Sequence, residues 1–156
     1  MNTEKWGSHM WIPLHVITFN APSIIPTEYA KNYTDFFRIL GVMLPCKYCR
    51  ESYCFFYKNL PIEEYLEDRM GLTYWLYAIH TLVSIKLKKK YLPTFNEIVY
   101  KYEEMRASSN PDYMKKETID KFIISAQQKY AKKTFDYMHV IISKLNKIEW
   151  DFSKLA

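Results

Sequence analysis

The sequence predicts an all-α fold, a bundle of four helices with a short fifth helix, followed by a helical extension. Apolar and aromatic side chains recur at spacings of three and four along most of the chain, as on the buried face of a helix. No segment alternates apolar and polar residues over a length useful for a strand. An apolar content of 49% is ample for a core, and only three glycines and seven prolines interrupt the 156 residues.

The first predicted helix covers about residues 8–20 and ends at the Ala21-Pro22-Ser23 segment. The second opens at Pro26-Thr27, because proline suits the first turn of a helix. Gly41 lies near the end of this second helix. Its apolar face consists of Tyr29, Tyr33, Phe36, Phe37 and Leu40.

A third helix is predicted to begin at Cys46, just after Pro45, and to continue to about residue 58. Pro61 and the acidic stretch 63–68 then indicate a loop or a short turn. A long fourth helix is predicted from about Leu72 to Lys89. Its apolar positions are Trp75, Ile79, Leu82, Val83 and Leu87.

A fifth helix is predicted after Pro93-Thr94 and through Tyr102, and the segment 108–112 is the one clear linker. Apolar positions between Ile119 and Leu145 then predict one long amphipathic helix or a helix pair. We therefore expect residues 1–106 to form one domain. Residues 107–156 would be a helical extension that packs on this domain or on a second subunit.

The net charge of +5 is distributed unevenly. Residues 1–85 carry seven Lys or Arg against eight Asp or Glu, whereas residues 86–156 carry fifteen against nine. A basic surface can meet phosphate, an acidic partner or an anionic membrane, but a solvated helix face explains it more simply. No run of 18 apolar residues occurs, so we expect neither a signal peptide nor a membrane span.

Three cysteines, Cys46, Cys49 and Cys54, lie within nine residues. This odd, clustered set is unlike a secreted disulfide framework. The Cys-x-x-Cys pair is a redox dithiol, half of a zinc site or two buried thiols. A helix start beside Lys47 and Arg50 favours the thiolate form and hence the redox reading. Zinc has weaker support because no second paired motif is present, and Cys54 is expected to be a buried thiol.

Trp11 and His15 are four residues apart and should share a helix face, and His80 lies among apolar residues of the predicted fourth helix. A lone histidine on an apolar face is more often a core residue than a ligand. Combined with a dithiol, however, these rings are compatible with a flavin pocket.

Three strings in this order resemble the Erv/ALR family of FAD-dependent sulfhydryl oxidases over roughly residues 5–105. They are Gly7-x-x-x-Trp11-x-x-Leu14-His15, Pro45-Cys46-x-x-Cys49 and His80-x-x-Val83. The compact form looks most like the versions carried by large DNA viruses of eukaryotes. The resemblance implies a five-helix fold that holds FAD, with the active disulfide against the isoalloxazine ring.

By position, the resemblance implies that Cys49 sits beside the flavin and that Cys46 exchanges with substrate thiols. It also implies two sets of FAD contacts. The first set lines the cofactor from the first helix and consists of Gly7, Trp11 and His15. The second flanks the adenine and approaches the ribose or phosphate, and it consists of His80, Val83, Leu87 and Lys89.

The sequence departs from the family pattern at several points. Thr81 and Ser84 stand where the family's third motif has two asparagines, and Lys88 replaces the glycine before the family's lysine. Neither the second structural disulfide common in the family nor a separate shuttle Cys-x-x-Cys is available.

The resemblance implies that client dithiols are oxidised through the cysteine pair and FAD by molecular oxygen, giving hydrogen peroxide. The expected partners are client proteins, a small thiol relay protein among them, and a second copy in a homodimer, without nucleic acid. The expected location is the host cytoplasm and, for a viral enzyme, the virion. The alternatives are a non-enzymatic helical zinc-binding or protein-interaction module, and a thioredoxin-type oxidoreductase. The latter is disfavoured because its fold needs a central sheet.

Overall fold

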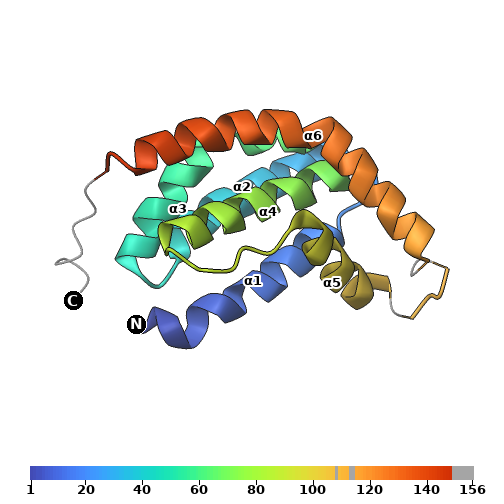
Figure 1. Cartoon of the computed structure of the whole chain (residues 1–156), viewed down its shortest axis with the longest axis horizontal. Helices are drawn as coiled ribbons and strands as arrows, with labels where there is room; N and C mark the ends of the chain where they lie inside the picture. Colours follow the sequence, from blue (N-terminus) through green and yellow to red (C-terminus); the bar gives the residue numbers. More distant parts are fainter. Residues whose placement is uncertain (108, 113–114, 149–156) are drawn as a thin grey trace.

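The computed structural model describes residues 1–107, 109–112 and 115–148 and confirms the all-α prediction (Figure 1). Within these ranges the only strand-type pairing is a single bridge between Ile24 and Asp68. None of the described helices is long and apolar enough to cross a membrane. In chain order the helices are α1 (Thr3–Phe19), α2 (Thr27–Met43), α3 (Lys47–Asn59), the short 3-10 helix η1 (Ile62–Tyr65), α4 (Arg69–Lys86), α5 (Phe95–Ala107) and α6 (Lys116–Leu145).

Two helices, α1 and α4, begin at side-chain caps that lie several residues before the start that their apolar pattern predicts. Asn2 Oδ1 accepts the backbone N–H of Glu4 at 2.9 Å, and α1 therefore begins at Thr3 and not near residue 8. Asp68 Oδ1 accepts the N–H of Gly71 at 2.8 Å, and α4 follows directly. Each such cap stabilises a helix by about 1 kcal/mol, because it pairs an N–H group that the helix itself leaves free.

α4 ends three residues earlier than predicted, in a Schellman turn. The N–H groups of Lys88 and Lys89 donate to the carbonyls of Ile85 and Ser84, at 2.9 and 3.0 Å. Lys88 has a φ of 53°, the left-handed conformation that glycine usually takes at this position. The three residues after Lys86 thus lie in a turn and not on the face of the helix.

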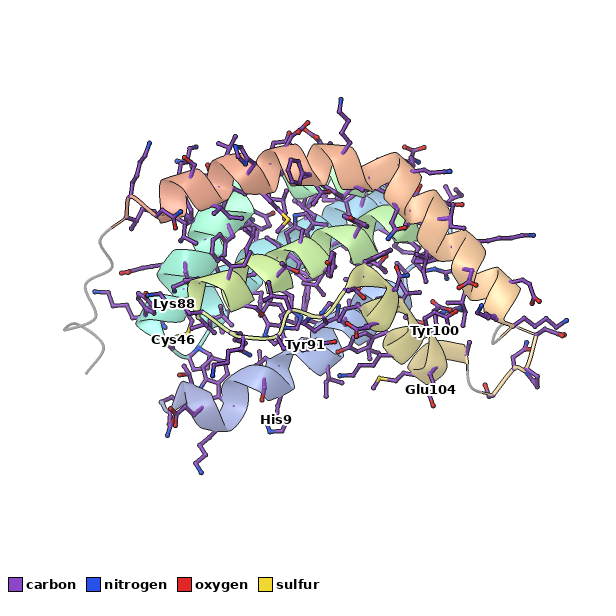
Figure 2. The ribbon with its side chains drawn as sticks, viewed as in Figure 1. His9, Cys46, Lys88, Tyr91, Tyr100 and Glu104 are labelled. Carbon is purple, nitrogen blue, oxygen red and sulfur yellow. A yellow bond between two sulfur atoms is a disulfide. The ribbon has the colours of Figure 1, made fainter. Side chains whose placement is uncertain are left out.

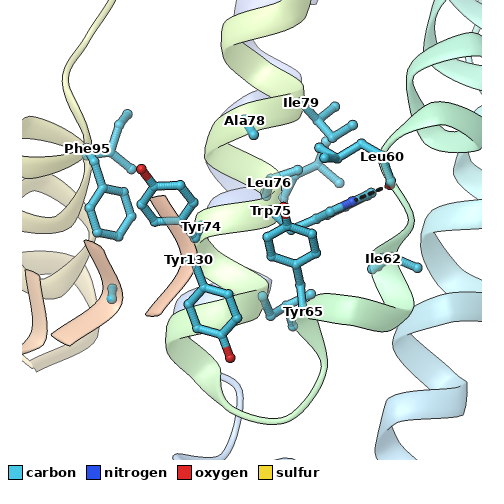
Figure 3. Close-up of a cluster of buried hydrophobic side chains, with 14 of the residues drawn as sticks. Leu60, Ile62, Tyr65, Tyr74, Trp75, Leu76, Ala78, Ile79, Phe95 and Tyr130 are labelled. Atoms are coloured by element: carbon cyan, nitrogen blue, oxygen red, sulfur yellow. Dashed lines mark hydrogen bonds between the residues drawn. The ribbon is translucent and has the colours of Figure 1, made fainter. Parts of the chain in front are cut away.

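α4 forms the centre of the core (Figure 3). Trp75 is completely buried, and its indole Nε1–H donates to the Leu60 carbonyl at 3.0 Å. The rings of Phe37 and Tyr57 meet Trp75 edge-on, with centroids 4.9 and 6.1 Å away. α2, α3 and α4 are therefore joined around one aromatic side chain whose polar atom is paired.

α6 is one continuous helix of 30 residues that arches over α4 (Figure 1). Its buried apolar side chains belong to the same core as those of α1 to α5. They are Ile119, Ile123, Ala126, Tyr130, Ile141 and Leu145, and the polar Thr134 is buried as well. The division into domains at residue 106 stays a prediction. Ser108 of the expected linker and residues 149–156 of the expected extension lie outside the described residues.

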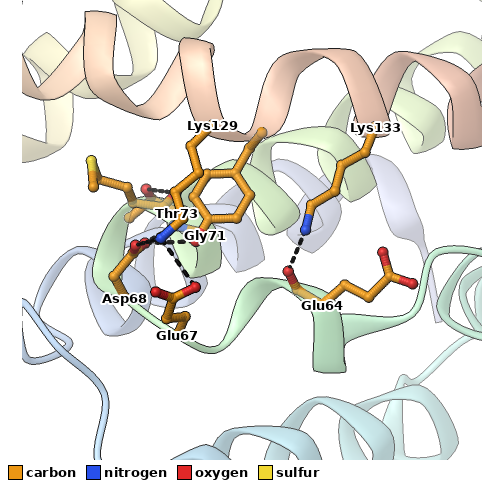
Figure 4. A network of polar contacts seen from close by, with 9 residues as sticks. Glu64, Glu67, Asp68, Gly71, Thr73, Lys129 and Lys133 are labelled. Carbon is orange, nitrogen blue, oxygen red and sulfur yellow. Dashed lines mark hydrogen bonds and ion pairs between the residues drawn. The ribbon is translucent and has the colours of Figure 1, made fainter.

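A buried polar cluster fastens α6 to the start of α4 (Figure 4). Asp68 is only 3% exposed, and its Oδ1 accepts the Tyr130 hydroxyl at 2.9 Å as well as the Gly71 N–H. Its Oδ2 accepts Lys129 Nζ at 2.7 Å, and this hydrogen bond raises the pKa of the lysine. A methyl group on Gly71 would lie 2.7 Å from the Tyr130 hydroxyl, so only glycine permits this approach. We call Asp68, Gly71, Lys129 and Tyr130 the Asp68 cluster.

Candidate functional site

Cys46 and Cys49 form a disulfide at the N-terminus of α3, with their Cα atoms 5.1 Å apart. The helix was predicted to begin at Cys46; it begins at Lys47 with Cys46 as its N-cap, and the N–H of Cys49 donates to Cys46 Sγ at 3.1 Å. Both cysteines are half-buried. Unpaired N–H groups and the positive end of the helix dipole therefore surround a sulfur pair that solvent still reaches.

Cationic side chains border the disulfide. Lys86, in the last turn of α4, places its Nζ 3.4 Å from the ring centroid of Tyr48, which lies between the two cysteines in sequence. Arg50 donates from Nη1 to the Leu44 carbonyl at 2.7 Å and so holds the segment before Cys46. Burial lowers the pKa of Lys86 to about 8. Positive charge on the residues next to the cysteines favours the thiolate over the thiol once the disulfide is reduced.

Trp11, His15 and His80 come together as a stack of rings between α1 and α4. Trp11 lies flat on His80, with ring centroids 3.9 Å apart and planes inclined by 8°. His15 Nε2 and His80 Nδ1 share a hydrogen bond of 2.9 Å, and Tyr102 of α5 stacks on His15 with centroids 4.7 Å apart. We call these four side chains the histidine stack.

Burial keeps both imidazoles of the histidine stack uncharged near neutral pH. Desolvation, followed by the charges of His80 and Lys101, lowers the pKa of His15 to about 3. Desolvation, followed by Lys89 and Lys101, lowers the pKa of His80 to about 4. His15 Nδ1 is buried without a hydrogen-bond partner. A polar atom left unpaired in this way is costly unless a ligand or water meets it.

A pocket of about 510 Å³ opens beside the histidine stack, between α1, α5 and the turn after α4. This volume falls within the range of small-molecule sites. Its rings and charges come mainly from Trp11, His80, Lys89, Tyr91, Lys101 and Tyr102. The carboxylate of Glu97 also lines it, held by the Tyr91 hydroxyl at 2.5 Å and the Thr94 N–H at 2.8 Å.

The structure brings some of the predicted cofactor residues to this pocket and leaves others outside it. Trp11, His80 and Lys89 line the pocket, and His15 lies completely buried in the stack beside it. A methyl group on Gly7 would meet no atom within 4 Å, so the space beside α1 is open there.

Two predicted residues lie elsewhere. Val83 is half-buried and packs against the hydrophobic core. Leu87 is 54% exposed because it is the C-cap of α4 and follows the last helical turn. The roles of all the predicted contacts stay predictions.

The sequence analysis did not predict that Tyr91, Lys101 and Tyr102 line the pocket. Tyr102 follows Ile98 by four residues, so helical periodicity places both on the buried face of α5. It does not indicate that this face meets His15. Tyr91 lies in the segment between α4 and α5, where no periodic signal exists.

One prediction about the cysteines is wrong. Cys54 was expected to be a buried thiol, but it is exposed and free. It lies on α3 opposite Gly41 of α2, close to the surface where these helices meet, and the core is filled instead by its neighbours Tyr53 and Phe56. Its distance in sequence from Cys49 places it more than one helical turn away from the disulfide.

A zinc site would need a set of ligands close together in space, and the described residues show none. Residues 1–107, 109–112 and 115–148 contain no group of three or more His, Cys, Asp or Glu side chains that could hold a metal ion. The pocket instead fits a planar organic ligand that carries negative charge. It offers aromatic faces and the cations Lys89 and Lys101, and the buried His15 lies in the stack behind His80.

Comparison with known proteins identifies the family. The family model described as "Erv1 / Alr family" matches residues 8–103, which include the histidine stack and the disulfide. No curated protein matches the chain significantly.

Proposed function

Because the chain belongs to the Erv1/Alr family, whose activity is sulfhydryl oxidation, we propose that it is a FAD-dependent thiol oxidase that forms disulfides in client proteins. The supporting observation is the end of α4. Lys86 packs on Tyr48 between the two cysteines, and three residues later Lys89 lines the pocket. One short turn therefore contacts the helix turn that carries the redox pair and also lines the candidate cofactor site.

Exchange with the client begins at Cys46, the N-cap sulfur. A client thiolate attacks Cys46 Sγ, the Cys46–Cys49 bond breaks, and the Cys49 sulfur leaves as a thiolate. A second client thiolate attacks the client sulfur of the mixed disulfide and releases Cys46. The client loses two electrons and two protons, and the enzyme gains both electrons as its reduced pair. Helix N–H groups and Lys86 stabilise the sulfur that leaves.

Trp11, His80, Lys89 and Lys101 are the residues that would hold the cofactor in the pocket. Their rings suit a planar system and their ammonium groups suit phosphates. Bound FAD would accept the two electrons of the dithiol and deliver them to oxygen, giving hydrogen peroxide. His80 lines the pocket as a neutral imidazole whose Nδ1 is paired with His15 Nε2, so its ring is held in place at that site.

We further propose that the electrons come from client protein dithiols, directly or through a small thiol relay protein, and that two copies of the chain form a homodimer. A viral origin, with action in the host cytoplasm or in the virion, is a proposal that stands on the family resemblance alone. A new disulfide in such a reducing compartment would otherwise be rare.

The test is oxygen consumption with dithiothreitol. Purified protein should be yellow, and Cys46→Ser and Cys49→Ser should each abolish turnover while FAD stays bound. Cys54→Ala is the matched control, since it removes an exposed thiol from the same helix. A cysteine-pair variant with near-normal oxygen consumption would refute the proposal.

The same preparation separates the rival functions. Colourless protein with one zinc ion per chain would indicate a metal-binding interaction module. Colourless, zinc-free protein that does not consume oxygen with dithiothreitol would exclude the thiol oxidase function without supporting the zinc-binding module.

A further inference from the structure

The surface around the disulfide is strongly cationic. Two segments meet there, residues 46–51 at the start of α3 and residues 86–90 at the end of α4, and their contact is the Lys86–Tyr48 pair. Together they carry a single carboxylate, Glu51, which Lys47 approaches at 3.9 Å. Their cationic side chains are Lys47, Arg50, Lys86, Lys88, Lys89 and Lys90.

Lys88 stands out within this surface because its backbone is in an unfavourable conformation. A φ of 53° costs a residue with a side chain free energy that glycine does not lose, and the Schellman turn would form with glycine equally well. The side chain is exposed, so packing in the core does not explain the lysine. Figure 2 shows Lys88 and Cys46 at the same end of the molecule. The residue therefore adds a positive charge at the end of the molecule where the disulfide lies.

Exposed apolar side chains lie next to the two cationic segments in the sequence. Val42 and Met43, in the last turn of α2 before the Cys46 segment, are 65% and 72% exposed. Leu87, next to Lys88, is 54% exposed. Large apolar side chains grouped beside a reactive site typically mark contact with a partner. Their combination with lysines suits a segment that is partly apolar and negatively charged.

We propose that this surface, formed by Val42, Met43, Lys47, Leu87 and Lys88, selects client segments whose dithiol is flanked by acidic residues. The inference rests on the proposed thiol oxidase function. Complementary charge would raise the rate of encounter and orient the client cysteines toward Cys46.

The test compares three peptides that share one cysteine pair and differ in the flanking residues, which are Glu, Gln or Lys. Dithiothreitol serves as an uncharged substrate in the same assay. At low salt the Glu peptide should be oxidised about 10-fold faster than the Lys peptide, measured as kcat/KM. The ratio should approach one in 1 M salt, where charges are screened beyond about 3 Å.

Lys88→Gly is the informative variant, because it removes the charge and relieves the backbone at once. The preference for the Glu peptide should fall about two- to threefold. The melting temperature should rise by about 3 °C, and dithiothreitol oxidation should stay unchanged. Lys121→Gln is the matched control: this exposed lysine lies near the beginning of α6, at the opposite end of the molecule from the disulfide (Figure 1).

The outcomes separate the two proposals. Equal rates for the Glu and Lys peptides, with dithiothreitol oxidation intact, would overturn the acidic-client inference alone. An unchanged preference in Lys88→Gly would overturn the part assigned to Lys88. Failure to oxidise dithiothreitol would overturn the thiol oxidase function instead.

Discussion

The Asp68 cluster and the histidine stack are both buried polar groups against α4, one at the start of the helix and one in its second half. In the Asp68 cluster, both carboxylate oxygens accept hydrogen bonds from Gly71, Lys129 and Tyr130. In the histidine stack, His15 Nδ1 has no partner, and a pocket of about 510 Å³ opens beside it.

We interpret the first as a polar group that serves the fold and propose that the second serves a ligand. In the Asp68 cluster the carboxylate already accepts hydrogen bonds at both oxygens. A bound molecule would therefore have to replace existing hydrogen bonds there. The histidine stack still contains a nitrogen without a hydrogen-bond partner, together with two uncharged imidazoles. A molecule bound beside the stack can therefore add favourable contacts there.

The largest effect should come from Asp68→Ala. This change leaves the Tyr130 hydroxyl and the Gly71 N–H without their acceptor and leaves Lys129 with Glu67 alone, and it should lower the free energy of unfolding by about 3 kcal/mol. That estimate is at the low end for a buried pair because Lys129 is partly exposed. The melting temperature should fall by roughly 6–12 °C, while FAD content of the folded protein is unchanged. Asp35→Ala removes an exposed ion pair and serves as the control.

A flavin-free Asp68→Ala protein at a temperature where it is folded would contradict the contrast. It would place the Asp68 cluster in the ligand site.

The histidine stack should make stability depend on pH. The pKa of His15 is about 3 in the folded protein and 6.5 when exposed, so the unfolded chain binds the proton first as the pH falls. Its contribution is complete above pH 6.5 and is lost progressively toward pH 3. The loss is about 1.4 kcal/mol per pH unit, or about 2 kcal/mol at pH 5.

Urea unfolding of ligand-free protein at pH 7, 6 and 5 measures this slope. In His15→Gln the decrease should be about 2 kcal/mol smaller, and in His139→Gln, which changes an exposed histidine, it should be unaltered. Identical slopes in all three proteins would mean that His15 is not buried uncharged.

Trp11→Leu tests the pocket with a smaller effect. Leucine keeps apolar cover over His80 but removes the flat ring, so FAD should bind about tenfold more weakly, a loss of about 1.4 kcal/mol. Titration of the ligand-free protein with FAD, followed by flavin fluorescence, gives the affinity. Phe135→Leu, which changes an exposed ring of α6, should bind FAD normally. Equal affinities would mean that Trp11 lies outside the cofactor site.

The smallest effect should come from Cys54→Ala. The thiol is exposed, so its loss should change the free energy of unfolding by less than about 0.5 kcal/mol. Turnover with dithiothreitol and with a protein client should also be unchanged, because Cys54 has no partner cysteine at shuttle spacing. Loss of turnover with the protein client alone would assign Cys54 a role in electron relay.

The sequence predicted the elements that depend on neighbouring residues. Apolar spacing located the helices, and Pro45 with Cys46 located the start of α3. The boundaries set by single capping side chains were missed, because Asp68 belongs to an acidic stretch that resembles a loop. The end of α4 was missed because Lys88 occupies a position where glycine is the usual signal.

Contacts between distant segments could not be predicted from local pattern. The Asp68–Tyr130 hydrogen bond joins residues 62 apart, and the stacking of Tyr102 on His15 joins α5 to α1. Family resemblance brought Trp11, His15 and His80 into one hypothesis, and the structure places their rings in contact. The resemblance did not indicate the exposure of Cys54, because that depends on how α2 and α3 pack in this chain.

Tyr130 lies near the C-terminal end of the described chain, so it is synthesised after the residues of the pocket. The ribosome makes α1, α4 and α5, which surround the pocket, before it makes α6, which closes the Asp68 cluster. At about 5–20 residues per second, the 30 residues of α6 take a few seconds to emerge. During that interval the nascent chain has every residue of the pocket but lacks the two donors to Asp68 that α6 supplies, Lys129 and Tyr130. We therefore expect cofactor capture by the nascent chain to be reversible until α6 docks and to become persistent afterwards.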